Sequence, residues 1–146
     1  MLHALARLLG PALAGPCLLL AAGTVAQTEM PQALEVQLVE RVEARWQALE
    51  TRDFTRAYTF MSPAYRSVFT EEMYLQQPAP TLERELTSVE ILNYDAAAAV
   101  ASVAVGVMSR PVKQTSAAAA AIQARPVRVI EQWILRNNSW WFSVIK

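Results

Sequence analysis

Cysteine and histidine are almost absent from the sequence, which contains one of each, Cys17 and His3. The region after residue 17 therefore has neither. A domain without cysteine forms no disulfides, so its hydrophobic core must stabilise it alone. The usual zinc sites, thiol nucleophiles and imidazole bases are excluded there as well. We therefore expect neither a metal ion nor another cofactor.

The chain also lacks an excess of charge of either sign. Its 13 basic and 13 acidic residues give a formal net charge of +0 and a pI near 6.6. A nucleic-acid-binding protein usually has a basic surface, and nothing in the composition indicates one. Hydrophobic residues make up 53% of the 146 residues and charged residues 18%. These values exclude wholesale disorder and leave room for one domain with a hydrophobic core.

Residues 1–26 predict a secretory signal peptide. One early cation, Arg7, precedes an uncharged apolar stretch over residues 8–26. Small residues at Thr24 and Ala26 lie three and one positions before the expected cleavage site at Gln27. Cleavage there leaves a domain of residues 27–146, exported to the periplasm or secreted, with no membrane segment.

Two alternatives to cleavage remain open. The apolar stretch could be an uncleaved membrane anchor, although four residues interrupt it and leave it barely long enough to span: Gly10, Pro11, Gly15 and Pro16. Cys17 could be a lipoprotein site, but proline directly before it and the apolar run after it disfavour that interpretation.

The first half of the domain has a helical pattern. Residues 31–51 place an apolar stripe at spacings of four and three, which predicts a core-facing helix: Leu34, Leu38, Val42, Trp46 and Leu49. Shorter helices are expected after capping residues, the first after Asp53 or Thr51 and the next two after Ser62 and Thr70.

The second half has the two-residue period of strands. Residues 86–94 predict one strand, 95–97 a turn and 101–108 the return strand. In that return strand the small residues Ser102, Ala104 and Gly106 predict the face against which a helix packs closely. Segment 111–126 is open between a helix, which its alanines favour, and a long loop or hairpin.

The last twenty residues predict a β-hairpin. Asn137 and Asn138 tolerate the left-handed backbone of a tight turn. If they form the turn, the register pairs Arg136 with Ser139, Leu135 with Trp140, Trp133 with Phe142 and Glu131 with Val144. One face then carries an apolar row that we expect to be covered by a second copy of the chain: Ile130, Ile134, Trp141 and Ile145.

Two segments resemble the nuclear transport factor 2-like superfamily, in its exported bacterial form, which includes the SnoaL-like proteins. The segments are RWQALETRDFTRAYTFMSPAYRSVFTEEMY and VRVIEQWILRNNSWW. They share a tryptophan in the first helix, a D-F-x-x-A-Y helix, an S-P-x-Y-R turn and an E-x-W strand followed by a second tryptophan. The resemblance implies an α+β fold in which N-terminal helices pack on a cone of curved antiparallel sheet. It also implies a pocket at the open end of the cone and, commonly, dimers formed through the sheet.

The same resemblance does not fix a reaction, because enzymes, binding domains and dimerisation domains share this scaffold. Five residues are candidates to line a ligand pocket: Glu131, Trp133, Tyr58, Tyr65 and Trp46. For the aromatic residues, packing in the core is the alternative.

Glu131 is the acid on an otherwise apolar strand face, where desolvation would raise its pKa and suit it to acid/base chemistry. We favour a structural role instead, in which Arg66 or another arginine pairs with it; a place at the open rim is the third reading. Arg66 is accordingly expected to tie the helices to the sheet rather than to clamp an anion.

The sequence thus favours an exported, non-catalytic domain that binds a small apolar or amphipathic ligand or a protein partner. One alternative is an isomerase, dehydratase or hydrolase that uses Glu131 with a tyrosine. The other is a structural dimerisation module. A core filled by Trp133, Trp140 and Phe142 would argue against catalysis, whereas a cavity joining Glu131 to a tyrosine hydroxyl would favour it.

Overall fold

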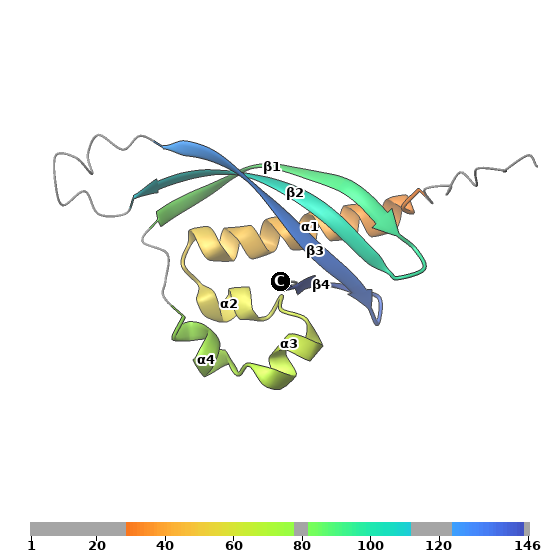
Figure 1. Ribbon diagram of the computed structural model, residues 1–146, viewed down its shortest axis with the longest axis horizontal. Coiled ribbons are helices and arrows are strands. Elements are labelled where there is room, and N and C mark those ends of the chain that lie inside the picture. The colour runs from red at the N-terminus through yellow and green to blue at the C-terminus, as the bar shows by residue number, and fades with distance from the viewer. Residues whose placement is uncertain (1–28, 78–81, 112–123, 145–146) are drawn as a thin grey trace, which may run out of the picture.

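The computed structural model describes residues 29–77, 82–111 and 124–144. Four helices precede a four-stranded antiparallel sheet in the order β1-β2-β3-β4. In Figure 1 strands β1–β3 arch over the long helix α1, and α2–α4 form a layer below α1 and β4. The predicted α+β class, with N-terminal helices packed on a curved antiparallel sheet, is confirmed. The signal peptide and most of segment 111–126 lie outside the described residues.

Helix α1 (Gln32–Glu50) uses the predicted apolar stripe. Leu38, Val42 and Trp46 are buried, while Leu34 and Leu49 are partly buried against the same cluster. The sheet contributes the other half of this core through residues that alternate along β2 and the hairpin: Ala101, Val103, Val105, Val107, Trp133 and Trp140. The core therefore lies between α1 and the concave face of the sheet.

Each of the three predicted caps begins a short helix. The side chains of Asp53, Ser62 and Thr70 accept backbone N–H bonds at the starts of α2 (Phe54–Tyr58), α3 (Pro63–Val68) and α4 (Glu71–Leu75). These bonds satisfy amides that a helix start leaves without partners.

Strand β1 (Leu82–Asp95) is longer than predicted and pairs with β2 (Val100–Pro111). Its turn spans residues 96–99, where Asp95 Oδ1 accepts the N–H groups of Ala97 and Ala98. The prediction that the small residues of β2 face a helix is wrong. The valines face α1, and the small set lies on the outer face.

The hairpin of β3 (Arg125–Arg136) and β4 (Ser139–Ser143) has the predicted register from Arg136–Ser139 to Gln132–Ser143. Asn137 and Asn138 have φ values of 50° and 59°, as the left-handed turn requires. The expected pair of Glu131 with Val144 lies beyond the end of β4.

The free edge of β4 is covered by a contact that the sequence did not reveal. Phe142 donates its N–H to the carbonyl of Phe60 at 2.8 Å, and its carbonyl accepts the N–H of Ser62 at 2.9 Å. Met61 therefore bridges to Phe142 in a parallel arrangement. The segment between α2 and α3 thus fixes the short helices to the sheet.

The outer face of the sheet is more polar than the expected apolar row. Ile130 is exposed, whereas Ile134 and Trp141 are half-buried and Ile145 lies outside the described residues. An Arg128–Glu90 ion pair and a Gln132–Ser102 hydrogen bond flank Ile130. Self-association through this face stays a prediction.

The turn generates a first prediction. Replacing Asn138 with valine should lower the free energy of unfolding by about 1–2 kcal/mol, because a β-branched residue is strained at positive φ. Asn138→Gly should change it by less than about 0.5 kcal/mol. Urea unfolding measures both. Asn93→Val, at an exposed position of β1 without positive φ, is the matched control and should cost little. If Asn93→Val lowered the free energy of unfolding as much as Asn138→Val, the loss could not be attributed to strain in the turn.

Candidate functional site

Glu131 lies on the concave face of β3, opposite Val103 of β2, and faces α1. Only 3% of its surface is exposed. A carboxylate placed so deep must receive hydrogen bonds and a countercharge, since isolated burial of a charge is costly.

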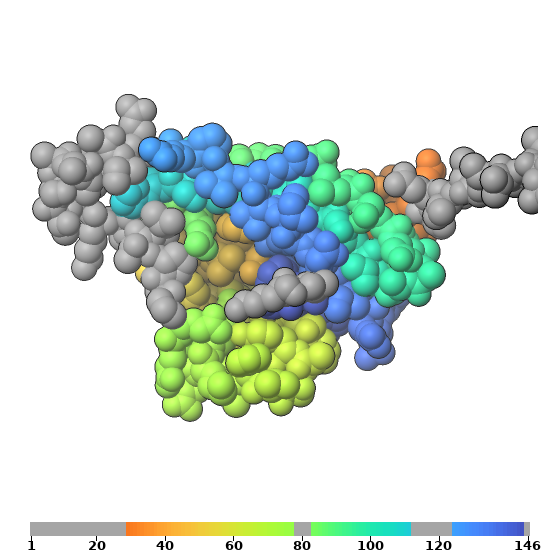
Figure 2. Space-filling view, in the orientation of Figure 1, coloured from red at the N-terminus to blue at the C-terminus, as the bar shows by residue number. Residues whose placement is uncertain are grey.

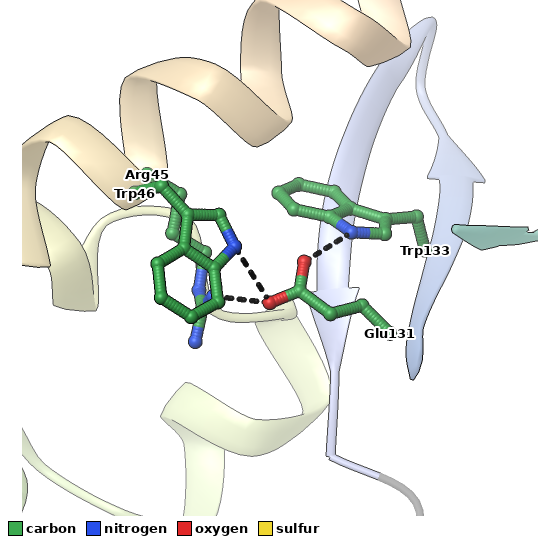
Figure 3. Close-up of polar contacts among 4 residues, drawn as sticks. All are labelled: Arg45, Trp46, Glu131 and Trp133. Carbon is green, nitrogen blue, oxygen red and sulfur yellow. Dashed lines mark hydrogen bonds and ion pairs between the residues drawn. The ribbon is translucent and has the colours of Figure 1, made fainter. Parts of the chain in front are cut away.

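Three donors surround this carboxylate (Figure 3). Arg45 Nη1 and Trp46 Nε1 donate to Oε1 at 2.7 and 3.0 Å, and Trp133 Nε1 donates to Oε2 at 3.0 Å. Two donors come from α1 and one from β3 itself. Both carboxylate oxygens are therefore occupied, and the network joins the helix to the sheet across the core.

Arg45 is the cation that pairs with Glu131, a role expected of Arg66 or another arginine. Arg45 lies seven residues after Leu38 and three after Val42, on the buried stripe of α1, which is the signal that could have identified it. Its guanidinium carbon lies 3.7 Å from the centre of the Phe142 ring. Burial lowers the pKa of Arg45, and the Glu131 carboxylate opposes that shift.

One buried nitrogen of Arg45, its Nε, has no acceptor among the described residues. Arg45 as a whole is only 8% exposed. A buried guanidinium N–H without an acceptor is costly, so this atom marks a place where a further acceptor would be stabilising.

Of the predicted pocket residues, the structure brings Trp46 and Trp133 to Glu131 but not the tyrosines. The Tyr58 hydroxyl donates to the carbonyl of Phe69 at 2.7 Å, and the Tyr65 hydroxyl accepts from Gln77 Nε2 at 3.1 Å. These rings form an aromatic cluster with Tyr74 among α2–α4.

Tyr74 is the tyrosine that sequence reasoning missed. It lies near enough to Arg45 for the two groups to influence each other's pKa. Burial raises the pKa of Tyr74, and the Arg45 charge opposes this. The hydroxyl is therefore a protonated donor at neutral pH, and no regular spacing in the sequence links it to α1.

Beyond Glu131, the concave face of β3 continues as an apolar surface. Val129 is half-buried and Val127 is 43% exposed. Figure 2 shows gold atoms of α1 between the blue atoms of β3 and the yellow-green short helices. Arg84 of β1 lies close enough to lower the pKa of Arg45 further. This apolar surface with Arg45, Tyr74 and Arg84 is named the open end below.

Other kinds of site receive less support. Within residues 29–77, 82–111 and 124–144, no three acidic, histidine or cysteine residues are grouped as a metal site would require. In the same ranges no helix is both long and apolar enough to cross a membrane. On the outer face, a shallow depression of about 360 Å³ lies over Gly106, where a Cβ atom would meet the Ser88 hydroxyl.

Neither a protein-family model nor a curated protein matches the chain. Among the solved structures similar to it are two with 14% sequence identity. A SEC-C motif protein from Rhodopseudomonas palustris has a TM-score of 0.47, with 71% of this chain and 73% of that one covered. A candidate dehydratase of the NTF2-like family from Streptomyces avermitilis has a TM-score of 0.49, with 80% and 99% covered. At these values neither likeness identifies a family, a substrate or an activity.

The network around Glu131 generates a second prediction. Glu131→Ala leaves Arg45 buried without its countercharge and should lower the free energy of unfolding by about 3–5 kcal/mol. Glu131→Gln keeps the shape and one acceptor oxygen, so its loss should be intermediate. Chemical unfolding of the three proteins measures this order.

The control is Glu90→Ala, which breaks an ion pair of similar length, 2.9 Å, but with side chains 61% and 64% exposed. Its cost should stay below about 1 kcal/mol, because solvent screens exposed pairs. A Glu131→Gln variant more stable than the wild type would contradict the structural role and favour an acid held neutral for catalysis.

Proposed function

We propose that this chain is a non-catalytic binding domain that holds a small amphipathic molecule with an anionic group at the open end. The observation that carries the proposal is the unpartnered, buried Nε of Arg45 beside an apolar strand surface. The anionic group would face Arg45, Arg84 and the Tyr74 hydroxyl, and the apolar part would lie against Val127 and Val129.

The charge of the open end supports an anionic ligand. Arg45 and Glu131 neutralise each other through their 2.7 Å ion pair, and Arg84 adds a positive charge that has no ion-pair partner among the described residues. Guanidinium groups with free donors bind carboxylates and phosphates through charge-assisted hydrogen bonds.

The geometry of Glu131 supports binding over catalysis. A general acid or base must reach a substrate proton, but both oxygens of Glu131 already accept bonds from core side chains. Trp133, which donates to one of these oxygens, is itself fully buried. The hydroxyls of Tyr58 and Tyr65 are engaged elsewhere, so the pairing of Glu131 with a tyrosine that an enzyme would need is not formed by these residues.

We also propose that the domain acts after export. This rests on the sequence of residues 1–26 alone, with its early cation, apolar stretch and small-residue cleavage site.

Titration with laurate, a carboxylate with an apolar chain, tests the binding function. The wild type should bind laurate saturably in calorimetry and bind dodecanol, the uncharged alcohol of equal chain length, about tenfold more weakly. Arg84→Gln and Tyr74→Phe should each weaken laurate binding by about threefold to tenfold.

The control is Arg128→Gln, which removes the same charge from the opposite face of β3 and should leave laurate binding unchanged. Equal affinities for laurate and dodecanol, or equal losses in Arg84→Gln and Arg128→Gln, would contradict recognition of an anion at the open end.

A further inference from the structure

A second group of arginines lies outside the open end, where α1, α3 and β4 meet. The Arg41 guanidinium carbon lies 4.6 Å from the centre of the Phe60 ring and 5.4 Å from that of Trp141. The Arg66 guanidinium carbon lies 4.9 Å from the centre of the same Trp141 ring. Two cations therefore share one indole.

Among the residues that the structure describes, neither arginine has a carboxylate partner. The ion pairs formed within the described ranges involve Arg45, Arg110 and Arg128, and none involves Arg41 or Arg66. Arg66 Nε is buried without a hydrogen-bond partner among those residues. Burial and then the charge of Arg66 lower the pKa of Arg41. The like charges thus repel each other, and no carboxylate of the described residues forms an ion pair with either of them.

Stacking leaves the hydrogen-bonding capacity of these groups largely unused. A guanidinium contacts an aromatic ring through its flat face, whereas its five N–H bonds lie in its plane and point from its edges. Arg41 uses one of them, its Nε, to donate to the carbonyl of Trp140 at 3.2 Å. That bond holds the Arg41 side chain in place, and the N–H groups on the other edges can donate to a ligand.

We propose that Arg41 and Arg66 form a binding site for an oxyanion, a carboxylate or a phosphate group, at the rim of Trp141. An oxyanion has several acceptor oxygens, so it can bond to two guanidinium edges at once and relieve their repulsion. The arginine that pairs with Glu131, expected to be Arg66 or another one, is Arg45, so Arg66 can take this role.

The site is independent of the open end. Trp141 and Phe142 are neighbours in β4, so their side chains point to opposite faces of the strand. Arg41 and Arg66 stack on Trp141, whereas Arg45 stacks on Phe142 and faces Glu131. Loss of Arg84 should therefore leave this site unchanged.

Titration with inorganic phosphate, followed by calorimetry and tryptophan fluorescence, tests the proposal. The wild type should bind saturably, and Arg66→Gln should weaken binding by about tenfold or more, since it removes a charge-assisted bond. Arg56→Gln, which removes an exposed charge from α2, should change the affinity by less than about twofold. Acetate titrated in the same way shows whether the site prefers a carboxylate.

Trp141→Phe separates the site from general electrostatic attraction. Phenylalanine keeps an aromatic ring but removes the reporter indole, so the fluorescence change should disappear while calorimetric binding persists. Arg84→Gln should bind phosphate as the wild type does, so this site and the open end can fail separately. Urea unfolding checks that each variant is folded, and Arg66→Lys replaces Arg66→Gln if that variant is not.

Absence of saturable phosphate and acetate binding by the wild type would overturn the proposal. Equal losses in Arg66→Gln and Arg56→Gln would also overturn it, because they would show attraction to net charge alone. The two arginines and the two rings, Phe60 and Trp141, would then serve only to connect α1, α3 and β4 by stacking.

Discussion

The structure depends on one buried carboxylate that joins two elements far apart in the sequence. Glu131 in β3 receives bonds from Arg45 and Trp46, which lie 86 and 85 residues earlier in α1. Burying this ion pair gains little by itself, because desolvation offsets the attraction, yet removing either partner is costly. The network therefore acts mainly on specificity: the register and rotation of α1 on the sheet that satisfy all three donors are strongly favoured over nearby packings. The same three bonds occupy both oxygens of the carboxylate.

Local physics explains which features could be predicted from the sequence. The caps at Asp53, Ser62 and Thr70 depend on one side chain and an amide three residues away. The hairpin register follows from an asparagine pair that tolerates positive φ. By contrast, the choice of Arg45 over Arg66 depends on how α1 is rotated over the sheet, and the contact of Met61 with Phe142 depends on a loop path. The prediction that the small residues of β2 face a helix is wrong because small side chains permit close packing but do not require it.

The arginines of the core region illustrate two ways to hold a cation near aromatic rings. Arg45 stacks on Phe142 and has a carboxylate at its edge, so its charge is neutralised. Arg41 and Arg66 stack on Trp141 with no carboxylate partner in the described ranges, so the aromatic rings and the bond from Arg41 Nε to the Trp140 carbonyl offset their desolvation. A cation–π contact contributes about 0.5–2 kcal/mol, and the repulsion between the like charges of Arg41 and Arg66 opposes that gain. An added oxyanion would reduce this repulsion.

The position of the open end follows from the lengths of the elements. Helix α1 has 19 residues and is about 28 Å long at the usual rise, whereas the 12 residues of β3 extend about 40 Å. A single helix cannot cover strands of this length, even when the sheet curves around it. Where α1 ends, its last residue, Glu50, accepts the N–H of Leu86 in β1. Leu86 pairs with Val107, which pairs with Val127, so α1 ends at this level of the sheet but on the side of β1. Val127, two strands away from that contact, is 43% exposed. The exposed apolar surface therefore lies across the sheet from the helix end, and the charges of Arg45 and Arg84 decide which ligand chemistry would suit it.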